Sequence, residues 1–261
     1  MLTRREVFVC AAALAGSSSI VDGRAPDLPA VPANFPSHEP ALAREMVGVS
    51  HGNVARVREL LEAHPALAKA AWDWGYGDWE TALGAASHMG NREIAELLLA
   101  HGAGPTIFSA AMLGQLEAVQ ALVVARPSIT RTRGPHGITL MAHAKAGGAP
   151  AQQVVAFLTV RGDADIPYTN EALSEQDIKA IVGTYAFGLL ESEAFTVTSA
   201  NGSLSIARVG AVERRLFHLG GRVFHPAGAE AVRITISGQL ERCDQIRVDD
   251  GPLTVVATRR N

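Results

Sequence analysis

Residues 81–102 read TALGAASHMGNREIAELLLAHG, and this stretch decides the fold of the first half of the chain. Paired alanines precede Gly90, and Leu98 and Leu99 follow it before a second glycine, Gly102. The pattern predicts two short helices joined by a tight turn, because apolar residues recur at helical spacing on both sides of the glycine. Gly102 suits the left-handed position that commonly follows the last turn of a helix.

The same skeleton recurs along the chain. A glycine is followed eight residues later by a leucine at Gly52 and Leu60, Gly90 and Leu98, and Gly114 and Leu122, with a looser copy from Gly148 to Leu158. Repeated helical hairpins predict a solenoid, because one hairpin cannot bury its apolar face alone. We therefore expect these four leucines to form one continuous buried ridge.

Residues 41–168 resemble the ankyrin repeat family. The residues that fit its unit best are Thr81, Ala86, Gly90, Ile94, Leu98, Leu99 and Gly102. The chain departs from the family at Ala82 and Gly84, where the usual opening has proline and histidine. Gly90 and Gly114 are only 24 residues apart, about nine fewer than one repeat, which removes the β-hairpin finger expected between the second and third copies. A generic bundle of helical hairpins is the alternative.

The C-terminal part changes character. Residues 169–182 predict a helical connector, in which Ser174 and Asp177 form a start resembling a capping box. Short β-forming segments then alternate with turns such as Asn201-Gly202, so residues 183–261 predict a small antiparallel β-sheet or barrel domain. The Gly183-Thr184-Tyr185 opening weakly resembles lipocalin-like domains that follow some bacterial serine hydrolases. The expected fold class is α+β multidomain, an ankyrin-like α-helical solenoid followed by this β domain.

Residues 1–25 predict an export signal. Arg4 and Arg5 precede a short apolar run, and small residues follow it. The arginine pair resembles the signals of the twin-arginine route; an ordinary secretory signal or an uncleaved interfacial anchor are the alternatives. The run is too short for a membrane span, which needs about 20 apolar residues. We expect a periplasmic or secreted protein with no stable membrane span after signal removal, in which residues 26–40 form a proline-rich linker.

The composition and the motif search point away from several functions. The net charge is −3 and the chain has no basic stripe, so nucleic-acid binding is not expected. Neither a phosphate-binding loop nor a catalytic or zinc-binding motif of known spacing occurs, so we expect no enzyme, no catalytic residue and no cofactor. His51 and His88 precede glycine turns and are expected to cap helix ends. His136 and His143 can share a helix face only if both are helical, which Gly137 opposes, so no metal site is expected.

Residues 70–80, AAWDWGYGDWE, hold all three tryptophans of the chain. Aromatic residues on a loop are frequent anchors of binding sites, and acidic residues rim this loop, while a second loop, residues 130–135, is basic. The proposed partner contacts are Trp72, Trp74, Tyr76, Trp79, Asp73, Asp78, Arg131 and Arg133. In the alternative, the tryptophans fold back onto the inner helices.

The sequence thus predicts a non-enzymatic module that binds another protein or a peptide. One alternative is a small-molecule carrier with a ligand inside the C-terminal barrel, lined by Tyr185, Phe187, Phe217 and Phe224. Another is an accessory protein of an exported enzyme system.

Overall fold

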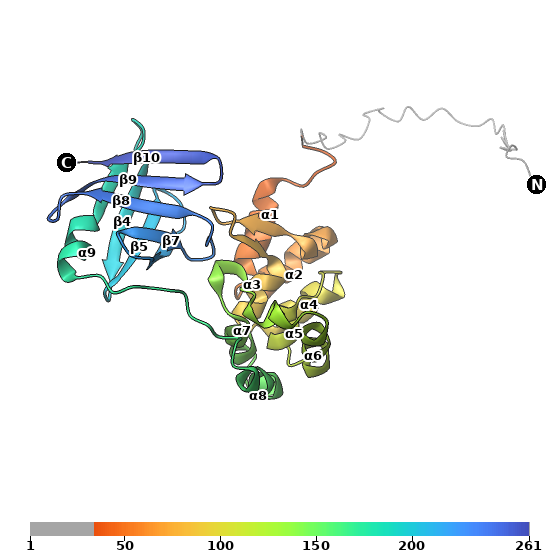
Figure 1. The fold of residues 1–261 in the computed structure, drawn as a ribbon. Helices are drawn as coiled ribbons and strands as arrows, with labels where there is room; N and C mark the ends of the chain where they lie inside the picture. The colour runs from red at the N-terminus through yellow and green to blue at the C-terminus, as the bar shows by residue number, and fades with distance from the viewer. Residues whose placement is uncertain (1–33, 261) are drawn as a thin grey trace, which may run out of the picture. The chain divides into compact units, whose positions relative to one another are not determined.

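The computed structural model describes residues 34–260. The predicted export signal and most of the proline-rich linker lie outside these residues. From His38 onward the chain forms one compact unit in which a helical part precedes a β part, so the fold is α+β (Figure 1). Within the described residues, no helix is both long and apolar enough to cross a bilayer.

The helical part consists of hairpins. Their helices are α1 (Pro40–Val49), α2 (Val54–Ala63), α3 (Ala82–His88), α4 (Arg92–Ala100), α5 (Ile107–Met112), α6 (Leu116–Ala125), α7 (Leu140–Ala146) and α8 (Gln152–Arg161). Side-chain caps start many of them: Asn91 accepts a hydrogen bond from the Ile94 amide, and Thr81 accepts one from the Gly84 amide. Gly114 makes the α5–α6 turn at a φ of +75°, and a Cβ there would collide with the Pro150 carbonyl.

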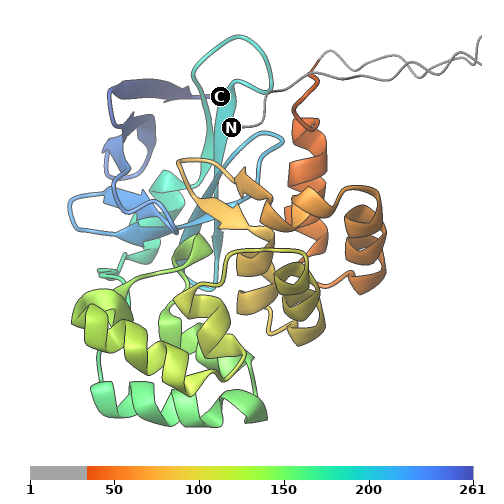
Figure 2. The same ribbon diagram turned by 90° about the vertical axis from the view of Figure 1, so that its right-hand side faces the viewer.

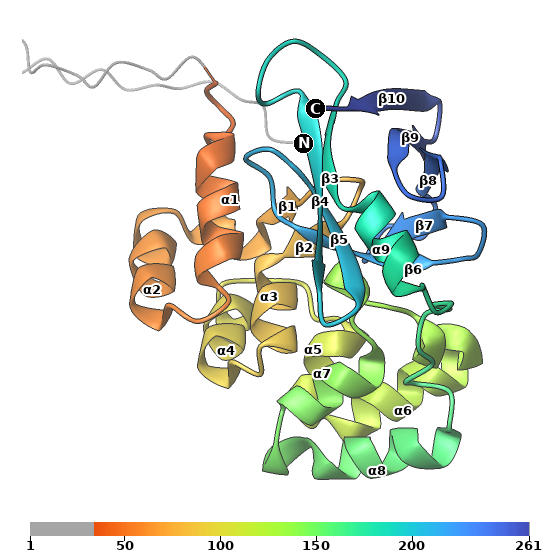
Figure 3. The ribbon, with the colours of Figure 1, turned by 90° about the vertical axis from the view of Figure 1, so that its left-hand side faces the viewer.

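Connecting segments differ between the hairpins. The short 3₁₀ helices are η1 (Pro65–Lys69), η2 (Pro127–Arg131), η3 (Pro135–Gly137) and η4 (Ala149–Ala151). Strands β1 (Ala71–Asp73) and β2 (Trp79–Thr81) pair as an antiparallel hairpin between η1 and α3 (Figure 3). No strand lies between α4 and α5, as the short spacing of the glycines predicts. In the last hairpin η4 accommodates the extra residues before α8.

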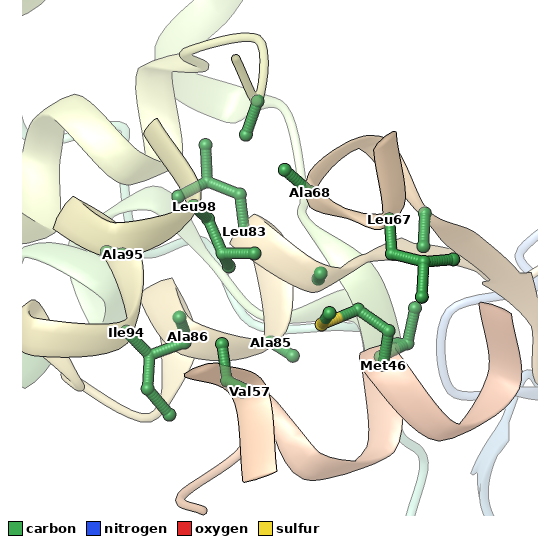
Figure 4. Close-up of a cluster of buried hydrophobic side chains, with 14 of the residues drawn as sticks. Met46, Val57, Leu67, Ala68, Leu83, Ala85, Ala86, Ile94, Ala95 and Leu98 are labelled. Atoms are coloured by element: carbon green, nitrogen blue, oxygen red, sulfur yellow. The ribbon is translucent and has the colours of Figure 1, made fainter. Parts of the chain in front are cut away.

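The inner helices α1, α3, α5 and α7 pack against one another in succession (Figure 2). Outer helix α2 packs against α4, and α6 against α8. The first core cluster, shown in Figure 4, gathers side chains such as Met46, Leu83 and Leu98. A second cluster fills the space between α5, α6, α7 and α8. Helical hairpins therefore share their cores with their neighbours.

The expected leucine ridge needs one correction. Leu60, Leu98 and Leu158 are buried as predicted, but Leu122 is 39% exposed. In α6 the buried positions are taken by Val119 and Val123 instead. The face of α6 that carries Leu122 therefore points away from the second core cluster.

The β part is a closed antiparallel barrel. Its strands are β3 (Gly183–Ala186), β4 (Ala194–Ala200), β5 (Ser203–Arg208), β6 (Arg214–His218), β7 (Val223–Pro226), β8 (Arg233–Gly238), β9 (Cys243–Asp250) and β10 (Leu253–Arg259). Successive strands pair in order, and β10 closes on β3. Helix α9 (Glu175–Ile181) precedes the barrel and contributes Ile181 to its core (Figure 3). Tyr185 and Phe224 are fully buried in that core.

Candidate functional site

Glu80 is the centre of a polar cluster inside the helical part. Strand β2 alternates exposed, buried and exposed residues, so Glu80 faces inward while its neighbours Trp79 and Thr81 face solvent. The Trp74 indole Nε1 donates a hydrogen bond to Glu80 Oε2 over 2.7 Å. On the other carboxylate oxygen, Oε1, His88 Nε2 lies at 2.9 Å and His136 Nε2 at 3.3 Å. A buried carboxylate is thus held by several donors at once.

The packing of the inner helices brings the imidazoles together. His51 lies two residues after the end of α1 and His88 ends α3. Because α1 and α3 are neighbours, the two ring centroids lie 5.0 Å apart. His51 Nδ1 lies 3.0 Å from the Gly48 carbonyl oxygen, so the predicted helix-capping role is confirmed for that nitrogen. Its other nitrogen, Nε2, lies 3.5 Å from Glu80 Oε2. We call His51, Glu80, His88 and His136 the histidine cluster.

His136 links the cluster to the barrel. It sits in η3 with a φ of +59°. Its Nδ1 lies 2.7 Å from Asp78 Oδ2, and its backbone amide donates to Asp78 Oδ1 over 2.9 Å. Asp78 also forms a buried ion pair with Arg214 of strand β6. This chain of contacts runs from the barrel to Glu80.

Burial and hydrogen bonding have opposite effects on the pKa values of this cluster. Burial acts to raise the pKa of Glu80, but hydrogen bonds from His136 and His88 outweigh it and lower that pKa to about 2. Burial acts to lower the pKa of His136, whereas its hydrogen bonds to Asp78 and Glu80 raise it to about 9. The nearby His143 has no carboxylate hydrogen bond, and burial lowers its pKa to about 4. Glu80 is therefore an anion under neutral conditions.

The tryptophan segment is not a free binding loop. Trp72 and Trp74 are partly buried against the first core cluster, in line with the alternative that the rings fold back onto the helices. Tyr76 packs against the barrel core, and this burial raises its pKa to about 12. Trp79 is 63% exposed and is the aromatic residue of this segment that faces solvent.

The charged residues proposed as partner contacts also have internal partners. Asp73 accepts a hydrogen bond from the Gly75 amide and shapes the turn. Asp78 is buried with Arg214 and His136, so it forms no accessible acidic rim, and those contacts lower its pKa although burial acts to raise it. Arg133 donates to the Gly137 carbonyl and lies 3.7 Å above the Tyr168 ring.

An open groove of about 590 Å³ lies next to the histidine cluster. Among its lining residues are Trp79, Phe108, Arg131, Arg133, Tyr168 and Glu230. The Tyr168 hydroxyl donates to Glu230, so this carboxylate has an internal partner. Arg131 remains exposed, with its Nε 3.5 Å from Asp163 Oδ2. The structure therefore brings Trp79 of the first predicted loop and Arg131 of the second into one groove.

The histidine cluster has no signature in the local spacing of the histidines. Its donors come from four separate places: the turn after α1, strand β2, the end of α3 and the 3₁₀ helix η3. No short sequence motif therefore contains them. One signal was present in the repeats. His51 lies in the turn after the inner helix of the first hairpin, His88 ends the inner helix of the second, and stacking of those helices makes the two residues neighbours. Each of the four cluster residues offers one donor atom, and these atoms lie within 4.8 Å of one another. Such a set can hold a metal ion, although the sequence led us to expect none.

Comparison with known proteins supports the repeat assignment. A family model of the ankyrin repeat matches residues 78–109, which include strand β2, α3, α4 and the start of α5. This range contains the stretch on which the resemblance was based, and it also contains Asp78, Trp79, Glu80 and His88. No curated protein matches the chain.

Proposed function

We propose that this protein is a non-enzymatic binding module whose hairpins α1–α8 stack as an ankyrin-type solenoid. The match to the ankyrin repeat and the succession of inner helices support this assignment. Repeat proteins of this kind use the extended surface formed by fingers and inner helices to bind other proteins. The Arg4-Arg5 pair before an apolar run supports export to the periplasm or beyond as part of the same proposal.

The observation that carries the proposal is the composition of the groove. Trp79 is 63% exposed there, beside Phe108 and the exposed guanidinium of Arg131. Tryptophan and arginine are the residues most enriched among those that dominate binding energy. The other charged residues of the groove are held by internal contacts: Asp78 pairs with Arg214, Glu230 accepts from Tyr168, and Arg133 donates to the Gly137 carbonyl. Arg131 also has a neighbour of opposite charge, Asp163, but its side chain stays 65% exposed. The proposed partner is an extended peptide segment that places an apolar side chain on Trp79 and an acidic one against Arg131.

Replacing Trp79 by alanine is expected to weaken peptide binding about 30-fold, the loss of one dominant contact of about 2 kcal/mol. The probe is a fluorescein-labelled peptide selected from a random library displayed on phage against the wild-type chain, and the readout is fluorescence polarisation. Because Trp79 is exposed, the free energy of unfolding should change by less than about 0.5 kcal/mol.

The matched control is Val160→Ala, since Val160 is 89% exposed on α8 and does not line the groove. The Arg131→Glu chain should bind peptides that carry an acidic residue more weakly than the wild type does. The Val160→Ala chain should bind them with wild-type affinity. Selected peptides that bind the Trp79→Ala and Arg131→Glu chains as well as the wild type would place the binding surface elsewhere.

A second candidate function is suggested by an apolar cavity at the barrel. The cavity has a volume of about 270 Å³, and Tyr76, Phe187, Phe195 and Val255 are among its lining residues. For a carrier, the sequence predicts a ligand inside the barrel, lined by Tyr185, Phe187, Phe217 and Phe224. Tyr185 and Phe224 instead fill the barrel core, and Phe217 stacks on His225, so only Phe187 of that set lines the cavity.

The apolar probe N-phenyl-1-naphthylamine is expected to bind in this cavity of the wild-type chain, with an increase in its fluorescence. Val255→Trp should fill the cavity and abolish that increase. Val256→Trp is the control, because the adjacent strand residue faces the other side of the sheet and is 47% exposed. No saturable fluorescence increase with the wild-type chain, or an increase that survives Val255→Trp, would remove the carrier function from consideration.

A further inference from the structure

The histidine cluster contains the donor set of a metal centre. The cluster offers four donor atoms, which lie within 4.8 Å of one another. We assign them as a Glu80 carboxylate oxygen and the Nε2 atoms that face it, those of His51, His88 and His136. The nitrogens lie 2.9 to 3.5 Å from the nearest Glu80 oxygen. In a tetrahedral zinc site with bonds of roughly 2.0–2.1 Å, donor atoms lie about 3.3 Å apart. Donor atoms that lie as far as 4.8 Å apart must therefore approach one another by about 1.5 Å to surround an ion, through rotation of their side chains.

Outer contacts already orient the proposed ligands. The Gly48 carbonyl oxygen, 3.0 Å from His51 Nδ1, favours a proton on that nitrogen and leaves the Nε2 lone pair free. Asp78 likewise holds Nδ1 of His136, with Oδ2 2.7 Å away, and an ion at Nε2 would take the place of the proton that His136 directs at Glu80. A carboxylate behind a histidine is the usual outer shell of a zinc ligand. The Trp74 indole fixes Glu80 Oε2 over 2.7 Å.

We infer that His51, Glu80, His88 and His136 bind one divalent transition-metal ion, with Zn²⁺ as the best match. Three imidazole nitrogens with one carboxylate suit zinc and its neighbours, whereas Mg²⁺ and Ca²⁺ prefer oxygen donors throughout. Glu80 is fully buried, while the side chains of His51 and His136 are 30% and 26% exposed, which gives the ion a path from solvent.

The proposed centre is structural in type. All four positions of a tetrahedral ion are taken by protein side chains, and such closed sites stabilise folds rather than perform chemistry. The ligands come from the first hairpin, from strand β2 and α3 of the second, and from η3, which precedes the last hairpin. One ion would thus link the first hairpin directly to η3, in addition to the contacts that neighbouring hairpins make through their shared hydrophobic cores.

The test uses the full-length chain, stripped with a chelator and titrated with ZnCl₂ by isothermal calorimetry, with bound zinc counted by inductively coupled plasma mass spectrometry. The expected result is one zinc per chain and a rise in the melting temperature with zinc concentration, because the ion binds only the folded state. His88→Ala and Glu80→Gln should each lose this zinc. Asp78→Asn changes the outer shell of His136 and also removes the charge that pairs with Arg214, and it should weaken zinc binding to the folded chain about 10- to 100-fold.

The control is His101→Ala. His101 follows α4, its Nδ1 lies 2.9 Å from the Leu97 carbonyl oxygen, and it takes no part in the cluster. This variant should keep the wild-type zinc affinity. If His88→Ala does not fold, His51→Gln serves instead, and Co²⁺ loaded into the wild-type chain should give the intense visible absorption of a four-coordinate site.

Three results would overturn the inference. They are an absence of zinc uptake by the wild-type chain, zinc uptake unchanged in His88→Ala or its substitute and in Glu80→Gln, and a weak six-coordinate Co²⁺ spectrum. Any of these would leave the cluster as a hydrogen-bonded network around Glu80. None of them bears on the peptide groove, whose test depends on Trp79 and Arg131.

Discussion

Replacing Leu98 by alanine is expected to lower the free energy of unfolding by about 2–5 kcal/mol. Leu98 is completely buried in the first core cluster, where it packs with residues of neighbouring hairpins (Figure 4). The substitution removes apolar burial and leaves a cavity that rigid neighbouring helices cannot close. Urea denaturation followed by circular dichroism measures the change.

The chain supplies a matched control for that substitution. Leu122 occupies the corresponding position of α6 but is 39% exposed. Leu122→Ala should therefore lower the free energy of unfolding by less than about 1 kcal/mol, because little apolar area leaves the core. Equal losses for the two variants would contradict the assignment of Leu98 to a shared core and Leu122 to the surface.

Replacing Asp78 by alanine is expected to lower the free energy of unfolding by about 3–5 kcal/mol, because it leaves Arg214 buried without its ion-pair partner. The side chains of Arg214 and Asp78 are only 6% and 3% exposed, so solvent cannot compensate the charge. The substitution also removes the acceptor of the His136 backbone amide. Urea denaturation monitored by tryptophan fluorescence gives the value, since Trp74 and Trp79 flank this site.

The double variant Asp78→Ala with Arg214→Met separates the ion pair from general damage at this position. Removing both charges leaves no buried charge unpaired, so the double variant should recover a large share of the stability that Asp78→Ala loses. A double variant as unstable as the sum of its single changes would show that the two side chains act independently.

The sequence predicts the helical hairpins well, and the reason is local. Caps such as Asn91, turn glycines such as Gly90 and leucines at helical spacing act within one hairpin, so they can be read without knowing the rest of the fold. The missing finger between α4 and α5 followed from spacing alone. The exposure of Leu122 could not be predicted from the spacing, because α6 has a neighbouring face that is equally apolar and carries Val119 and Val123.

The candidate site could be predicted only in part, because its residues meet through tertiary packing. Trp79 and Arg131 were proposed as contacts on two separate loops, and the structure places them in one groove. The sequence leaves open whether the other aromatic residues of this segment contact a partner or fold back onto the helices; in the structure Trp74 donates to Glu80 and Tyr76 packs on the barrel. Buried partners such as Arg214 lie more than a hundred residues away in sequence, so local composition carries no sign of them.

The most direct test of the proposed function is a transverse-relaxation-optimised NMR titration of the ¹⁵N-labelled chain with a selected peptide. We expect chemical-shift changes at the indole NH of Trp79, at Phe108 and at Arg131, with Val160 on α8 unchanged. Shifts confined to the outer helices or to the barrel cavity around Val255, with Trp79 and Arg131 unmoved, would contradict the proposed function.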